Sequence, residues 1–204
     1  MNGIFKLIAV GFCAALGAFE AVAANIVSNP GFETGDLSAW TISGAHSGAD
    51  DNGIYYGVDA VDAHSGAAGA FFGPIGGVLN LSQTLATTPG DTYSVTVWVA
   101  QSPEATPPYV NSLDVTFGGA TLFSQTGVPD AGYTQYSFSA TATAASTALV
   151  FGFRDDLGFF SLDDISVSSG APAGVPEPAS TLLALSGLAC GVGWGARRRL
   201  NRKL

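Results

Sequence analysis

The feature that most constrains the fold of this chain is an alternation of apolar and polar residues with a period of two. From Tyr93 to Val99, the odd positions hold a tyrosine and three valines, whereas the even positions between them hold serine, threonine and Trp98. Successive side chains of a β-strand point to opposite faces, so this segment predicts a strand with one buried face. The turn-forming sequence Pro-Gly-Asp at residues 89–91 precedes the strand and marks its beginning.

Short segments of the same kind recur along the chain, and clusters of Gly, Pro, Ser and Thr separate them. None of the segments has the period of a helix. Two of them flank Gly118 and Gly119, which supply the positive φ angles of a tight hairpin turn. A series of short strands predicts an all-β sandwich. The expected strands cover residues 40–43, 69–72, 79–85, 92–99, 113–117, 120–124, 133–140, 148–153 and 159–167.

The first 24 residues have the pattern of a signal peptide. Lys6 precedes an apolar run over residues 7–19, and the sequence Ala-Val-Ala-Ala at residues 21–24 offers small residues to a signal peptidase. The apolar run is shorter than the roughly 20 residues of a spanning helix. We therefore expect export by the Sec route and removal of residues 1–24.

The C-terminus combines three features in a fixed order. Residues 171–178 form a linker with a Pro-Glu-Pro motif, residues 179–196 are uncharged and rich in glycine, and residues 197–204 are basic. An uncharged run of this length predicts a transmembrane helix, and the positive-inside rule keeps the basic tail in the cytoplasm. The residues that carry the pattern are Pro176, Glu177, Pro178, Arg197, Arg198 and Arg199.

These three features together resemble the PEP-CTERM sorting signal of Gram-negative bacteria that produce exopolysaccharide. The resemblance covers residues 175–204 and implies recognition by an exosortase, a membrane protease or transpeptidase that would cut near the Pro-Glu-Pro motif. It implies a transient anchor in the inner membrane, followed by delivery to the cell surface or the extracellular matrix.

Removal of both ends leaves an acidic domain without cysteine. Cys13 and Cys190 lie in the terminal segments, so the mature chain holds no disulfide and no thiol site. Residues 25–175 contain 14 carboxylates and Arg154 as their one basic residue, a net charge of −13. This charge argues against nucleic acid as a partner and favours cations and neutral ligands.

The acidic domain resembles carbohydrate-binding modules of the galactose-binding-like type. The resemblance is carried by residues 25–35 (NIVSNPGFETG), by Trp40 shortly after, by His-Ser-Gly at residues 64–66, and by residues 93–99 and 160–167. It implies a jelly-roll β-sandwich over residues 25–170 that contacts extracellular polysaccharide. It also places Trp40 in the core.

The same resemblance implies a structural calcium ion. Glu33 and Asp163 or Asp164 would supply carboxylates, and the loop around Ser65 would supply backbone carbonyls. Calcium takes about six to eight oxygen ligands and neutralises clustered carboxylates where no basic residue is near. By alternation Asp163 shares a face with Ile165, so we expect Asp163 to be the inward ligand, whereas Asp164 would point to solvent or contribute through its backbone. The alternative is that these acids are solvated strand ends.

Sugar binding requires an exposed aromatic plane on which the apolar face of a sugar can stack. Trp98 faces away from the apolar row of its strand, and three tyrosines lie in expected loops. The alternative for Trp98 is packing in a second layer of the sandwich. The candidate ligand-binding residues are Trp98, Tyr55, Tyr56 and Tyr109.

Catalysis finds little support in the sequence. It contains no nucleophile-elbow, metal-protease or phosphate-loop pattern, and nothing selects the pair of carboxylates that a glycosidase needs. We therefore expect an exported, non-catalytic surface or matrix protein that contacts polysaccharide. Two alternatives stay open: a purely structural secreted domain without a ligand site, and a small glycoside hydrolase.

Overall fold

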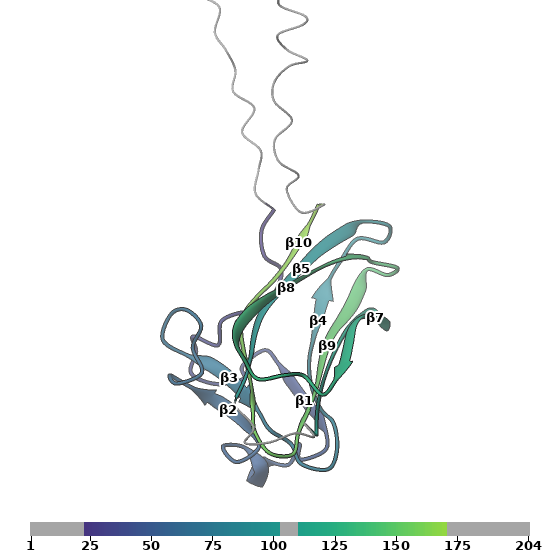
Figure 1. Cartoon of the computed structure of the whole chain (residues 1–204). Coiled ribbons are helices and arrows are strands. Elements are labelled where there is room, and N and C mark those ends of the chain that lie inside the picture. Colours follow the sequence, from purple (N-terminus) through teal and green to yellow (C-terminus); the bar gives the residue numbers. More distant parts are fainter. Residues whose placement is uncertain (1–22, 103–109, 171–204) are drawn as a thin grey trace, which may run out of the picture.

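The computed structural model describes residues 23–102 and 110–170, which are coloured in Figure 1. Most of the expected signal peptide, Tyr109, and the expected linker, transmembrane helix and basic tail over residues 171–204 lie outside the described residues. Within the described ranges, no helix has the length and apolar character needed to cross a membrane.

Ten strands and one short 3-10 helix make up the described chain. The jelly-roll sandwich predicted from the sequence is confirmed, because the strands form two packed antiparallel sheets (Figure 1). The elements are β1 (Thr41–Gly44), η1 (Ala49–Asp51), β2 (Tyr56–Asp59), β3 (Gly69–Phe72), β4 (Leu79–Ala86), β5 (Thr92–Gln101), β6 (Asn111–Phe117), β7 (Ala120–Thr126), β8 (Ala131–Thr141), β9 (Ser146–Asp155) and β10 (Phe160–Ser169).

The two sheets have different strand orders. The first, here called sheet A, has the order β1-β4-β9-β6-β7, and the second, called sheet B, has the order β2-β3-β10-β5-β8. Most neighbours within a sheet are distant in sequence, so the chain crosses repeatedly between the sheets. Gly118 and Gly119 join β6 to β7 with φ angles of 59° and 81°, as the hairpin prediction requires.

The facing sides of the two sheets form the core. Val95, Val97 and Phe151 have no exposed surface, and buried and partly buried residues alternate along the whole of β5. The ring of Phe72 in sheet B stacks on that of Phe153 in sheet A, with centroids 4.4 Å apart. Full burial of one such side chain contributes about 1.5–3 kcal/mol to folding.

Trp40 is 8% exposed and lies in this core, as predicted. Its indole N–H donates a hydrogen bond to the carbonyl oxygen of Asn29 at 3.1 Å. That bond satisfies the polar atom of the ring, so the side chain can be buried at little cost.

One strand was missed in the sequence. β2 contains Tyr56 and pairs with β3 at the edge of sheet B. The segment around it is rich in aspartate and glycine, residues that are depleted in strands, and therefore resembles a loop. Pairing with β3 and burial of Tyr56 override this local preference.

A β-bulge in β10 breaks the alternation between Asp163 and Ile165. Asp163 lies opposite Trp98 on β5, whereas Ser166 lies opposite Thr96, so β10 has one residue more than its partner here. The extra residue is Asp164, with a φ of 48°. Residues directly opposite each other share a face of the sheet. The prediction that Asp163 points inward is therefore wrong: it lies on the outer face of sheet B, with Trp98.

Candidate functional site on the outer face of sheet B

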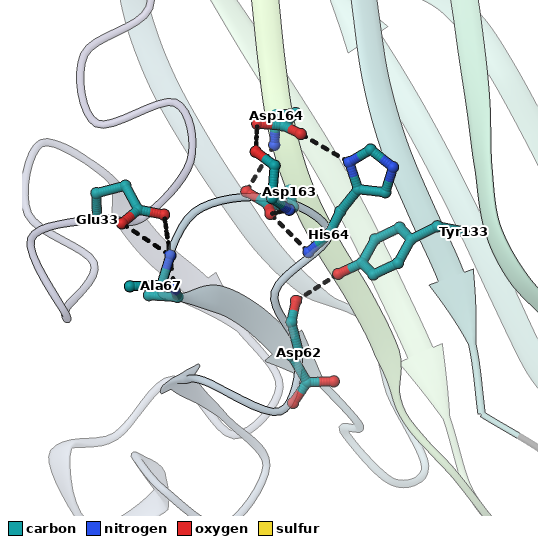
Figure 2. Close-up of polar contacts among 9 residues, drawn as sticks. Glu33, Asp62, His64, Ala67, Tyr133, Asp163 and Asp164 are labelled. Carbon is teal, nitrogen blue, oxygen red and sulfur yellow. Dashed lines mark hydrogen bonds and ion pairs between the residues drawn. The ribbon is translucent and has the colours of Figure 1, made fainter.

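Residues 62–68, here called the covering loop, lie over the outer face of sheet B and bury Asp163 completely. Oδ2 of Asp163 accepts hydrogen bonds from the backbone N–H groups of His64 at 2.8 Å and Ser65 at 3.0 Å (Figure 2). Oδ1 accepts a hydrogen bond from the N–H of Asp164 at 2.7 Å. Burial raises the pKa of Asp163, and these three donors oppose the rise. Asp163 therefore anchors the middle of the covering loop.

Glu33 holds the far end of the same loop. Its two carboxylate oxygens accept a hydrogen bond from the N–H of Ala67 at 3.0 and 3.1 Å, and Oε1 also faces the N–H of Ala68 at 3.4 Å (Figure 2). Gly66 has a φ of 69°, and a side chain there would collide with the Glu33 carboxylate. The close approach of loop and carboxylate therefore requires glycine at this position.

Asp164 contacts the loop through side chains. Its Oδ2 lies 2.7 Å from Nδ1 of His64, and its Oδ1 accepts a hydrogen bond from the hydroxyl of Ser65 at 2.8 Å. About a third of its side chain is exposed, which agrees with the expected direction toward solvent. The structure thus brings Glu33, Ser65, Asp163 and Asp164 together around one loop.

The geometry gives these carboxylates a role as acceptors of loop N–H groups. Among the described residues, no three His, Cys, Asp or Glu side chains are placed so that they could hold a metal ion. Backbone carbonyls would have to complete a calcium site, as the resemblance implies. Calcium stays a prediction.

Aromatic rings surround the same loop. The ring of His64 stacks on Trp98 with centroids 4.0 Å apart, and Tyr133 meets His64 edge-on at 4.9 Å. Trp98 points away from the core, as predicted, but His64 covers one face of its ring. The hydroxyl of Tyr133 donates a hydrogen bond to the carbonyl oxygen of Asp62 (Figure 2). Burial and nearby carboxylates raise the pKa of Tyr133, so this hydroxyl stays protonated.

The three tyrosines that were predicted to bind ligand differ in their positions. Tyr56 is only 5% exposed and donates its hydroxyl to the carbonyl oxygen of Gly48, so the prediction that it offers a sugar-stacking plane is wrong. Tyr55 is half-buried and packs on His46 with ring centroids 3.9 Å apart. Tyr109 lies outside the described residues.

Two adjacent hollows were not anticipated. The first has a volume of about 290 Å³ and contains the rings of Phe71 and Phe159. The second has a volume of about 450 Å³ and lies beside Asp130. Ser102 lines both. We call the pair the double hollow. The first is lined by Gly53, Ile54, Asp59, Asp62, Phe71, Ser102 and Phe159, and the second by Ala100, Gln101, Ser102, Asp130, Ala131, Gly132 and Ser161.

The sequence does contain a signal for the aromatic part of this surface. Phe71 precedes Phe72, and Phe159 precedes Phe160. Neighbouring side chains of a strand point to opposite faces, so only one phenylalanine of each pair can enter the core. Phe72 and Phe160 are fully buried, and Phe159 is 37% exposed.

Comparison with protein families addresses the C-terminus. Residues 174–199 match the PEP-CTERM protein-sorting motif. The sorting signal predicted from the sequence is therefore confirmed. The PEP-CTERM motif implies an exported protein that an exosortase processes.

Comparison with solved structures addresses the domain. TmCBM61, solved in complex with beta-1,4-galactotriose, superposes with a TM-score of 0.51 at 20% identity, over 72% of this chain and 100% of that chain. The CBM22-1 xylan-binding domain from Paenibacillus barcinonensis gives a TM-score of 0.53 at 15% identity, over 76% and 100%. At such identities the likeness shows a shared fold, that of carbohydrate-binding modules.

The same fold also occurs as a small part of a larger protein. The enzymatically active domain of tailspike protein 4 from bacteriophage CBA120 gives a TM-score of 0.54 at 14% identity, over 72% of this chain but only 21% of the tailspike chain. No curated protein matches the chain by sequence. The fold similarity alone therefore assigns no activity.

Proposed function

We propose that the exported domain is a non-catalytic module that contacts extracellular polysaccharide. The observation that carries this proposal is the double hollow, whose first part is lined by two aromatic side chains, on a carbohydrate-binding-module fold. The apolar C–H face of a sugar packs on aromatic rings, while its hydroxyls bind a few placed polar groups. Phe71 and Phe159 supply the rings, and Ser102 and Asp62 supply hydroxyl and carboxylate groups on the walls.

The test is affinity electrophoresis of the exported protein through gels that each contain one soluble polysaccharide. We expect at least one polymer to retard the protein. Phe159→Ala should weaken the retardation about tenfold or more, because aromatic anchors carry most of the binding energy at such sites. Trp98→Ala should change it less, because His64 already covers one face of that ring. Free migration in every gel would contradict the proposal and favour a purely structural domain.

We further propose that the precursor is anchored in the inner membrane by residues 179–196. Cleavage near Pro176-Glu177-Pro178 would then free the domain for the cell surface or the matrix. The prolines favour an extended backbone, which a protease can grip. A variant with Pro176→Ala and Pro178→Ala should accumulate as a larger, membrane-bound precursor on immunoblots of fractionated cells. The conservative change Leu204→Val is the control, and equal processing of both variants would contradict the proposal.

The resemblance also leads us to propose a calcium ion beside Glu33 and Asp163. Carboxylate oxygens are ligands that a hard cation prefers. Arg154, the one lysine or arginine in the described ranges, pairs with Asp156 and with neither Glu33 nor Asp163. When bound, the ion would neutralise the carboxylates. Glu33 and Asp163 would then hold the covering loop against sheet B without mutual repulsion.

A further inference from the structure

In the first part of the double hollow, each phenylalanine ring packs directly on a glycine. A side chain at Gly57 would come within 2.7 Å of the ring of Phe71, which lies opposite it on β3. A side chain at Gly73 would collide with the ring of Phe159 in the same way. The two rings meet edge to face, with centroids 5.6 Å apart. They therefore form a packed aromatic surface and are not loose side chains on the exterior.

Carboxylates stand at the rim of this aromatic surface. Asp59 is exposed and Asp62 is half-buried, and both line the hollow. Oδ1 of Asp59 accepts hydrogen bonds from backbone N–H groups, and Oδ1 of Asp62 accepts one from the hydroxyl of Ser161. Burial raises the pKa of Asp62, and the neighbouring carboxylate of Asp59 raises it further.

No basic side chain of the described chain neutralises this charge. Arg154 is the one lysine or arginine in the described ranges, and it forms a two-point ion pair with Asp156 at 2.9 and 2.8 Å. It does not line either hollow. A ligand with a positive charge would therefore be attracted to the rim, whereas a uronate or sulfate group would be repelled.

We propose that the hollow between Phe71, Phe159 and the Asp59–Asp62 rim binds a hexosamine polymer with free amino groups. This inference rests on the proposed function and names its ligand class. The sugar ring would pack on the phenylalanines, and the ammonium group would contact the two carboxylates and the negative face of an aromatic ring. N-acetylation removes the ammonium charge, and with it the ion pair with the carboxylates and the cation–π contact.

The test compares three oligosaccharide probes by isothermal titration with the exported protein, in buffers that contain EGTA to exclude divalent cations. The probes are a glucosamine hexamer, its fully N-acetylated form and a hexamer of galacturonate. We expect the glucosamine hexamer to bind about tenfold or more tightly than the N-acetylated form, and the galacturonate not to bind. The preference should shrink several-fold between about 0.05 and 0.5 M salt, because added salt shortens the range of charge interactions.

Matched variants test which residues cause the preference for free amino groups. Asp59→Asn with Asp62→Asn should remove the preference for free amines, so that the glucosamine and N-acetylated hexamers bind equally, and Phe159→Leu should weaken the binding of both. Asp114→Asn removes one charge from sheet A and should have no effect. Thermal melts check folding, and the amide oxygen introduced by Asp62→Asn can still accept the hydrogen bond from the Ser161 hydroxyl.

Three results would overturn the inference: equal binding of both hexosamine probes, a preference that survives in the double variant, or an equal loss in Asp114→Asn. In each case polysaccharide binding itself would stand. Absence of binding to any polysaccharide would instead remove the proposed function.

Discussion

Which side chains face outward from sheet B determines which groups its outer surface offers to a ligand. Asp163 and Phe71 both have sequence neighbours that belong to the core, yet both face outward. For Phe71 the reason is ordinary strand alternation, which could have been read from the doublet with Phe72. Asp163 also faces outward by alternation with Leu162, but the bulge at Asp164 returns Ile165 to the core and so makes Asp163 seem to share its face. No pattern in the sequence announces this bulge. Residue-level prediction thus succeeds where alternation is unbroken and fails where a bulge interrupts it.

The charge of Asp62 is expected to destabilise the domain at neutral pH. Burial raises the pKa of Asp62 above 3.8, so the folded state favours the neutral carboxyl. This contribution to stability is present below the unfolded pKa and is lost as the pH rises through the raised pKa. Asp62→Asn should therefore increase stability at pH 7 by less than about 1 kcal/mol, because solvent screens a half-exposed carboxylate. Below the unfolded pKa the gain should disappear.

Urea unfolding of the parent and the variant at several pH values measures this difference. Asp36 is the matched control, because hydrogen bonds from Ser38 and Thr34 lower the pKa of its exposed carboxyl. Asp36→Asn should therefore show the opposite sign at pH 7. A gain for Asp62→Asn that is the same at every pH would contradict the electrostatic explanation.

At the scale of elements, the residues around the covering loop were predicted from the sequence, whereas the way in which they hold the loop is known only from the structure. Glu33 and Asp163 lie at opposite ends of the domain sequence, and the resemblance placed both beside Ser65. The structure adds that the first two hold the loop through its backbone N–H groups. β2 was missed because its pairing with β3, and not its own composition, makes it a strand.

Gly66→Ala is expected to loosen the covering loop. The change imposes a side chain at a φ of 69° and also collides with the Glu33 carboxylate. Strain and lost hydrogen bonds together should lower the free energy of unfolding by about 2–4 kcal/mol. Gly76→Ala is the matched control, since Gly76 has a φ of 72° with open space around it, and should cost only about 1–2 kcal/mol. Equal losses in urea unfolding would mean that the Glu33 contact does not hold the loop.

At the scale of the whole molecule, alternation and turn residues predict a sandwich but cannot assign each strand to a sheet. The assignment follows from which apolar faces meet, for example Phe72 on Phe153 across the core. The strong negative charge of the exported domain, by contrast, follows from its composition and does not depend on the arrangement of the strands. With Arg154 already paired to Asp156, cations from outside the chain are left to balance the carboxylates.

At this scale, calcium is expected to raise the melting temperature of the whole domain. Binding to the folded state alone stabilises it by about 2.7 kcal/mol when free calcium is one hundred times Kd. For a domain of this size that corresponds to a rise in Tm of roughly 5–10 °C. EGTA should therefore lower the melting temperature of the exported protein by several degrees, as measured by calorimetry. Glu33→Gln should abolish the shift while keeping an acceptor for the Ala67 N–H, whereas Asp91→Asn, in a turn away from the covering loop, should retain it. Identical melting curves with calcium and with EGTA would show that Glu33 and Asp163 hold the loop without a metal, through the hydrogen bonds to its backbone.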